Sequence, residues 1–325
     1  MTTQTTQTAR VRRGATAGAA AIAVALLGAG CSSSAKATTS TAGADATSGG
    51  GTITMVGAEN EYANVIAQIG GKYVRTDAIM SDPNTDPHTF EASPAVAQEV
   101  SSAQLVVQNG VGYDTFMNTI EQAAPSSSRK VINVQNLLGL PDSTANPHLW
   151  YKPATMPAVA RAVAADLAQI QPANAAYFQA NLTAFDNSLA PWAKAVAALR
   201  AAHPDTPVAT TEPVADYMLQ AVGTDNLTPW SLQADIMNGV DPSPQDVSLQ
   251  EGLFKQHKVK IFLYNQQVTD SLTQSFLNLA KQNGIPVVGV YETMPTDGYD
   301  YQSWMLAEVD AVDKALSAGQ STEKL

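Results

Sequence analysis

The sequence predicts an α/β protein with two lobes, each built on a parallel sheet, and a helix that joins them. Three observations predict this fold. Short β-branched runs alternate with helical stretches from residue 52 onward, the second half repeats the pattern of the first, and the residues between the halves show no strand pattern. The 325 residues, 45% of them hydrophobic, can bury a core in two domains of about 100 to 150 residues each.

The first lobe is expected over residues 52–155, where β-branched runs and helical stretches alternate. The predicted strands are 52–56, 73–79, 105–108 and 131–134. The predicted helices are 61–69, 94–102 and 113–124. This order of strand and helix is typical of parallel strands connected by crossover helices.

The second lobe is expected over residues 203–325 and follows the same arrangement. The predicted strands are 208–211, 226–227, 261–264 and 287–291. The predicted helices are 214–222, 244–256, 271–283 and 301–318. The first of these helices follows Pro213, a residue that suits a helix N-terminus.

A helical region is predicted between the lobes, over residues 156–202. Its second part places five apolar residues near helical spacing: Tyr177, Leu182, Phe185, Leu189 and Trp192. This spacing predicts one unusually long helix that links the lobes. Pro191 falls inside it and is expected to kink or locally disrupt it.

The first 51 residues precede both lobes and have the pattern of an exported lipoprotein. An uncharged run rich in Ala and Gly follows Arg10, Arg12 and Arg13, and it is too short to be expected to span a membrane. Residues 1–30 are therefore predicted to be a signal peptide. The run LLGAGC resembles a lipobox, in which the thiol of Cys31 takes a diacylglycerol. Gly28 stands where leucine is usual.

The segment that follows the lipobox, residues 31–51, consists almost entirely of Ser, Thr, Ala and Gly, and is expected to act as a flexible tether. Cys31 is the single cysteine of the chain and cannot form an internal disulfide. The Arg12-Arg13 pair fits either a general or a twin-arginine export signal.

Charge and motifs exclude several functions. The chain has 18 Lys and Arg against 29 Asp and Glu, a net charge of −11, so nucleic acid is not an expected partner. The sequence contains no H-E-x-x-H, G-x-S-x-G or Walker motif, and no G-x-G-x-x-G that opens a helix. Gly110-Val111-Gly112 is interpreted as a tight turn. No enzyme class is therefore indicated by a motif.

Two histidine loops share a local pattern, Pro-His-x-aromatic. They are Asp86-Pro87-His88-Thr89-Phe90 and Asn146-Pro147-His148-Leu149-Trp150. Proline stiffens each loop, and the aromatic residue can pack beneath the imidazole. Each loop follows a predicted strand, and ligands of open parallel sheets bind beyond the carboxyl ends of the strands.

Two acidic residues also follow predicted strands, Glu212 after 208–211 and Glu292 after 287–291. A carboxylate at a strand end is usually just solvated, but two carboxylates that converge with His88 and His148 would neutralise a divalent cation. The other two histidines, His203 and His257, lie in contexts typical of surface residues.

Taken together, the lipobox, the two histidine loops, the T-E-P-V segment at Glu212 and the Y-E-T-x-P segment at Glu292 resemble the metal-binding family of solute-binding proteins of ABC transporters, the cluster A-I type. The resemblance covers residues 53–318. It implies two (β/α)₄ lobes joined by one long rigid helix, with a metal site in the cleft. The implied metal ligands are His88, His148, Glu212 and Glu292.

This sequence departs from the family pattern in three places. Zinc members commonly have histidine where this chain has Glu212, the fourth ligand is often aspartate where this chain has Glu292, and the loop rich in His and acidic residues of many zinc members is absent. Two carboxylates that can each turn bidentate would move the preference from zinc toward manganese or iron(II).

The function implied by the resemblance is capture of a divalent transition metal (zinc or manganese, or iron(II)) for import, with delivery to a cognate ABC permease and no catalysis. The protein is expected to be exported, monomeric, and anchored by its lipid to the outer face of the cell membrane or the periplasmic face. The alternatives are a metal-dependent hydrolase, which would need an open coordination position, and a surface adhesin of the same family.

Overall fold

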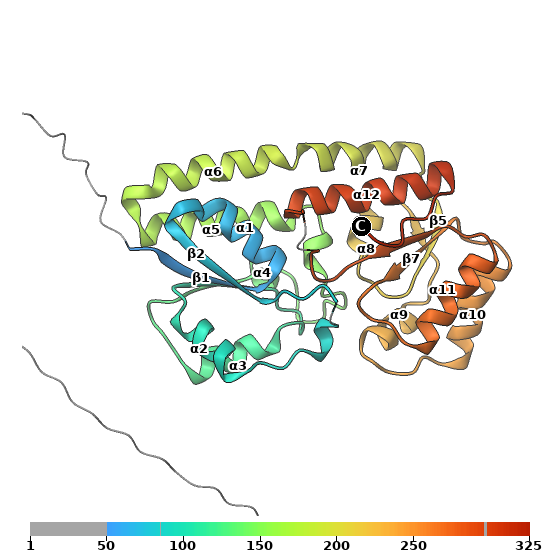
Figure 1. The fold of residues 1–325 in the computed structure, drawn as a ribbon, viewed down its shortest axis with the longest axis horizontal. Coiled ribbons are helices and arrows are strands. Elements are labelled where there is room, and N and C mark those ends of the chain that lie inside the picture. Colours follow the sequence, from blue (N-terminus) through green and yellow to red (C-terminus); the bar gives the residue numbers. More distant parts are fainter. Residues whose placement is uncertain (1–50, 85, 296–297) are drawn as a thin grey trace, which may run out of the picture. The chain divides into compact units, whose positions relative to one another are not determined.

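The computed structural model describes residues 51–84, 86–295 and 298–325, whose strands form two four-stranded sheets (Figure 1). The first sheet contains β1 (Ile53–Glu59), β2 (Val74–Met80), β3 (Leu105–Gln108) and β4 (Lys130–Asn133) in the order β2-β1-β3-β4. The second contains β5 (Pro207–Thr210), β6 (Asp225–Asn226), β7 (Ile261–Asn265) and β8 (Val287–Val290) in the order β6-β5-β7-β8. All neighbouring strands are parallel, as predicted.

Helices connect the strands in both lobes. Those of the first lobe are α1 (Asn60–Gly70), α2 (Pro94–Ser102), α3 (Thr115–Ala123) and α4 (Val134–Leu137). Those of the second lobe are α8 (Asp216–Val222), α9 (Trp230–Met237), α10 (Pro244–Lys255), α11 (Ser271–Gln282) and α12 (Tyr301–Ala318). Short 3₁₀ helices occur at Gly71–Tyr73, Pro87–Thr89, Leu149–Tyr151 and Pro172–Asn174.

The two central strands of the first sheet, β1 and β3, are buried on both faces, and successive side chains of each strand point to opposite faces. Met55 and Leu105 point into the core formed with α1 and α5 (Thr155–Ile170), whereas Val56 and Val106 point into the core formed with α2 and α3. Figure 1 shows these helices on the two sides of β1 and β2. The near-continuous apolar runs of the sequence follow from this burial on both faces.

The second sheet is covered in the same way. Val208 and Leu263 belong to the core shared with α8 and α12, and Ala209 and Phe262 to the core shared with α9, α10 and α11. The core that contains Val208 is continuous with the α1/α5 core of the first lobe, so one hydrophobic cluster extends through both lobes.

Two consecutive helices, α6 (Ala175–Ser188) and α7 (Ala190–Ala202), run end to end between the lobes (Figure 1). The α6 helix packs on α1 and α5, and the α7 helix packs on α8 and α12. The helix is interrupted at Leu189, and Pro191 lies in the first turn of α7. The break therefore occurs where Pro191 predicts it, because proline is tolerated in a first helical turn but not in a helix interior.

Several helices begin or end beside residues that are typical helix caps. Ser93 accepts a hydrogen bond from the Val96 N–H and precedes Pro94, and α2 has the predicted bounds. Asp300 and Ser303 form a capping box at the start of α12, and Gly319 ends that helix in the left-handed conformation.

Some elements differ from the prediction. β1 continues to Glu59 although Gly57 and Ala58 have low strand propensity, because Gly57 pairs with Ala78 and Glu59 with Met80 in the parallel ladder. A side chain at Gly57 would come within 2.8 Å of the Ala63 Cα, so glycine permits the close approach of α1. The four-residue α4 and the eight-residue α9 were not predicted, since they are too short for a periodic pattern.

No helix in the described part of the chain is long and apolar enough to cross a membrane. The predicted signal peptide, Cys31 and all of the predicted tether except Gly51 lie outside the described residues.

Candidate metal site

Three of the four predicted ligands meet beyond the carboxyl ends of the strands. His88 lies in the 3₁₀ turn that follows β2, His148 directly precedes the turn Leu149–Tyr151, and Glu292 lies two residues beyond β8. One ligand atom from each of these residues lies within 4.8 Å of the other two. Histidine nitrogen and carboxylate oxygen at this separation can bind one transition-metal ion.

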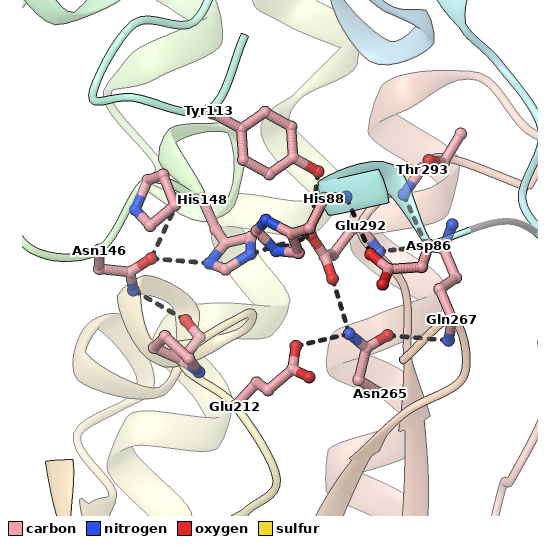
Figure 2. A network of polar contacts seen from close by, with 12 residues as sticks. Asp86, His88, Tyr113, Asn146, His148, Glu212, Asn265, Gln267, Glu292 and Thr293 are labelled. Atoms are coloured by element: carbon pink, nitrogen blue, oxygen red, sulfur yellow. Dashed lines mark hydrogen bonds and ion pairs between the residues drawn. The ribbon is translucent and has the colours of Figure 1, made fainter. Parts of the chain in front are cut away.

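The Oε2 atom of Glu292 is the centre of this group. It lies 3.1 Å from His88 Nε2 and 3.2 Å from His148 Nε2, and it accepts a hydrogen bond of 2.9 Å from the Tyr113 hydroxyl. Figure 2 shows the three side chains directed toward this carboxylate. His148 and Glu292 are fully buried, whereas 23% of the His88 side chain is exposed. His88 therefore forms the more accessible side of the site.

Both histidine loops use the same local hydrogen bond. Asp86 Oδ1 accepts from the His88 N–H at 2.8 Å, and Asn146 Oδ1 accepts from the His148 N–H at 3.0 Å. An Asp or Asn two residues before each histidine thus closes a turn around the proline. The repeated sequence pattern is therefore Asx-Pro-His, and the Asx residue is the part that the sequence interpretation missed.

The aromatic residues of the two loops behave differently. Trp150 packs edge-on against the His148 imidazole, with ring centroids 5.4 Å apart. The ring contact of Phe90 is with Phe116, and His88 instead packs against Tyr113 at 5.3 Å. The prediction that an aromatic side chain supports each imidazole is confirmed for His148 and wrong for His88, because Phe90 turns toward α3.

Asn146 also fixes the ring of His148. Its Oδ1 lies 2.8 Å from His148 Nδ1, while its Nδ2 donates to the Pro213 carbonyl at 2.7 Å. Because a carbonyl can only accept, the amide must present Oδ1 to the imidazole, and Nδ1 of the ring carries a proton. His148 Nε2 is then the nitrogen that binds a metal.

Glu212 lies outside the group of three, on the far side of Asn265. The Asn265 amide donates from Nδ2 to Glu212 Oε2 at 2.8 Å and to Glu292 Oε1 at 2.7 Å (Figure 2). Glu212 is buried, and its Oε1 has no hydrogen-bond partner among the described residues. A buried carboxylate oxygen without a partner is costly unless a cation or a proton compensates it.

The two carboxylates have opposite pKa shifts. Burial and the charge of Glu292 raise the pKa of Glu212 well above its usual range. Burial also raises the pKa of Glu292, but the charge of His88 and hydrogen bonds from both histidines outweigh it and hold this pKa far below its usual value. A divalent cation beside these groups would favour the ionised form of both and would oppose the effect of burial at Glu212.

The two imidazoles also differ. Burial lowers the pKa of His148. Burial acts in the same direction on His88, but the charge and hydrogen bond of Glu292 prevail and raise its pKa. The neutral form that metal binding requires is therefore easier to reach at His148.

Tyr113 is brought to the site by the turn at Gly110-Val111-Gly112. The φ angles of these residues are 80°, 54° and 78°. Such positive values suit glycine but are strained for Val111, a β-branched residue. The sequence correctly predicts a tight turn here, but it gives no sign that the turn directs the following tyrosine toward Glu292.

The remaining predicted surface histidines lie away from this group. His257 is exposed and His203 is half-buried at the end of α7. Within the described residues, neither belongs to a cluster of potential ligands.

Two α/β lobes with parallel sheets, and a His/His/Glu group at the strand ends in which His148 and Glu292 are buried, define a metal-binding solute-binding protein. Comparison with known proteins agrees. Residues 56–315 match the ZnuA family, described as zinc-uptake complex component A, periplasmic, and the chain belongs to this family.

Curated relatives cover most of the chain at low identity. The metal ABC transporter substrate-binding lipoprotein FimA of Streptococcus parasanguinis is 23% identical over 293 residues, which is 82% of this chain and 90% of FimA. The manganese ABC transporter substrate-binding lipoprotein PsaA of Streptococcus pneumoniae is 23% identical over 246 residues, covering 69% of this chain and 74% of PsaA.

Solved structures share the fold. The periplasmic zinc-binding protein TroA from Treponema pallidum aligns with a TM-score of 0.70 at 17% identity, covering 83% of this chain and 100% of TroA. A crystal structure of ZnuA aligns with a TM-score of 0.67 at 21% identity, covering 82% of this chain and 100% of that chain.

Proposed function

We propose that this protein captures a divalent transition metal ion, zinc or manganese, and delivers it to an ABC permease for import. The observation that carries the proposal is the convergence of His88 Nε2, His148 Nε2 and Glu292 Oε2 within 4.8 Å. The family membership supports it, as do the names of FimA and PsaA, which are metal ABC transporter substrate-binding lipoproteins.

The cargo ion is proposed to be bound by His88, His148, Glu212 and Glu292. Two neutral imidazoles and two carboxylates balance the charge of a divalent ion. His148 is held by Asn146, and Glu292 is held through its backbone N–H, which donates to Gln267 Oε1. In this proposal Glu212 completes the set, and its Oε1 gains the partner that it otherwise lacks.

Access to the site is proposed to occur from the side of His88. His88 and Tyr113 line a cavity of about 300 Å³ together with Met237 and Asn238 of the second lobe. An ion that enters here would meet the partly exposed His88 before it reaches the buried His148 and Glu292.

A binding role fits this site better than hydrolysis. Hydrolytic metal sites leave a coordination position for water and place a general base beside it. Four protein ligands would occupy all coordination positions of a tetrahedral ion and leave none for water. The nearby Tyr113 hydroxyl donates a hydrogen bond to Glu292 and so does not act as a base toward it. We therefore propose a carrier that releases its ion unchanged.

The protein is proposed to be exported and anchored through a lipid on Cys31, as the lipoprotein names of FimA and PsaA support. Cys31→Ser should release the protein from membranes and leave metal affinity unchanged. Fractionation after fatty-acid labelling tests this. Retention of a correctly cleaved Cys31→Ser protein on membranes would refute the anchor.

The ligand assignment is tested by alanine substitution of His88, His148, Glu212 and Glu292, with zinc and manganese affinity measured by calorimetry. Each variant should bind metal far more weakly while its circular dichroism spectrum is unchanged. His203→Ala and His257→Ala are the matched controls, since they also remove a histidine. An effect of either control as large as that of His88→Ala would show that the assignment is wrong.

A further inference from the structure

Asn265 holds both carboxylates of the proposed site at once. It is the last residue of β7 and is fully buried. Its Nδ2 donates to Glu212 Oε2 at 2.8 Å and to Glu292 Oε1 at 2.7 Å. One amide group therefore commits one oxygen of each carboxylate to a hydrogen bond.

The orientation of this amide is fixed by its surroundings. Asn265 Oδ1 accepts from the Gln267 N–H at 3.0 Å, and the Asn265 N–H donates to Thr211 Oγ1 at 3.0 Å. A flipped amide would place Oδ1 against two carboxylates and lose the bond from Gln267. The donor side therefore faces Glu212 and Glu292 and cannot be exchanged for the acceptor side.

The consequence is that each carboxylate has one oxygen that the Asn265 amide does not bond. For Glu292 this is Oε2, the atom that faces the two histidines and that also accepts the hydrogen bond from the Tyr113 hydroxyl. For Glu212 it is Oε1, which has no hydrogen-bond partner among the described residues. With His88 Nε2 and His148 Nε2, the available atoms are two nitrogens and two oxygens, one from each residue.

We propose that Asn265 is a positioning residue that keeps Glu212 and Glu292 monodentate and thereby restricts the bound ion to four ligands. Four-coordinate geometry suits zinc, whereas manganese is better served by a higher coordination number with more oxygen ligands. Two carboxylates that could turn bidentate would favour manganese, and Asn265 opposes that change because it would break a charge-assisted hydrogen bond at each carboxylate. Asn265 is thus a determinant of selectivity for zinc over manganese.

This inference rests on the proposed function, and it is tested by removing the amide donor in Asn265→Ala. The matched control is Asn226→Ala. Asn226 Nδ2 also donates to a carboxylate, Asp216 Oδ1 at 3.0 Å, in the same lobe but not at the site. Asn265→Ser retains a hydroxyl donor and serves as a second variant that should restore part of the wild-type behaviour.

Two readouts are measured on each folded protein: zinc and manganese affinities by competition with a chromophoric chelator, and the visible absorption of the Co²⁺ form. Four-coordinate Co²⁺ absorbs strongly, and ions with more ligands absorb weakly. We expect strong bands for the wild type and Asn226→Ala. For Asn265→Ala we expect weak bands and a zinc-to-manganese affinity ratio lower by about 10-fold, as is common when a group that orients a ligand is lost.

The outcomes separate the two proposals. Strong Co²⁺ bands and an unchanged affinity ratio in Asn265→Ala, with wild-type metal binding intact, would overturn the role of Asn265 and leave the proposed function standing. Wild-type affinity in His148→Ala would overturn the proposed function, and the inference about Asn265 with it.

Discussion

Replacing Asn146 with alanine should weaken metal binding although Asn146 is not itself a proposed ligand. The side chain makes three buried hydrogen bonds: its Oδ1 accepts from the His148 backbone N–H at 3.0 Å and lies 2.8 Å from His148 Nδ1, and its Nδ2 donates to the Pro213 carbonyl at 2.7 Å. Without this acceptor the remaining proton of the neutral ring can move to Nε2. The nitrogen that faces Glu292 then lacks a free lone pair for a metal.

The size of the effect follows from these contacts. Loss of a group that orients a metal-binding histidine typically costs about 10- to 100-fold in affinity, or about 1.4 to 2.7 kcal/mol. The free energy of unfolding should fall as well, by about 3 kcal/mol, because three buried hydrogen bonds at about 1 kcal/mol each are removed. The His148 imidazole itself remains buried against Trp150 and Tyr113, so it should stay near its place.

The assay is zinc affinity by chelator competition, combined with long-range ¹H–¹⁵N NMR of the His148 ring to identify the protonated nitrogen. Asn278→Ala is the control, since Asn278 is an exposed amide on α11. Zinc affinity of Asn146→Ala equal to that of the control, or a His148 Nδ1 that carries no proton in the metal-free wild type, would refute the reasoning.

Three further predictions concern other parts of the chain. Burial raises the pKa of Glu308 from its ordinary range to about 8, so its contribution to stability is lost as the pH rises from that ordinary range through about 8. The free energy of unfolding of Glu308→Gln relative to that of the wild type should therefore be about 3 kcal/mol higher at pH 8 than at pH 5, as measured by denaturation. An equal difference at the two pH values would contradict this. Gly289→Ala should lower the unfolding free energy by about 1 to 3 kcal/mol, because its Cβ would lie 2.7 Å from the Glu323 carbonyl carbon; unchanged thermal unfolding would count against that overlap. Glu212→His should raise the zinc-to-manganese affinity ratio in chelator competition by exchanging an oxygen ligand for nitrogen, and a ratio that falls would argue against Glu212 as a ligand.

The sequence by itself determined most of the elements and indicated all four proposed ligands. The bounds of α2 and α12 were predictable because their ends are set by neighbouring residues, Ser93-Pro94 for α2 and Asp300 and Gly319 for α12. The strands β1, β3, β7 and β8 were predictable because burial on both faces leaves nearly continuous apolar runs. The turns around His88 and His148 are local as well, since Asp86 and Asn146 act across two residues.

Only the tertiary structure decided which groups meet. Glu292 lies 144 residues from His148 in the chain, and the parallel order of the strands brings both to the same ends of the sheets. The sequence placed Glu212 and Glu292 as equivalent carboxylates at strand ends, whereas in the fold Glu292 lies between two imidazoles and Glu212 lies behind Asn265. Tyr113 and Asn265 had no detectable sequence signal, because a tyrosine after a turn and an asparagine at the end of a strand are locally ordinary. Side-chain hydrogen bonds between distant segments assign their roles, and such bonds depend on packing that no short stretch of sequence encodes.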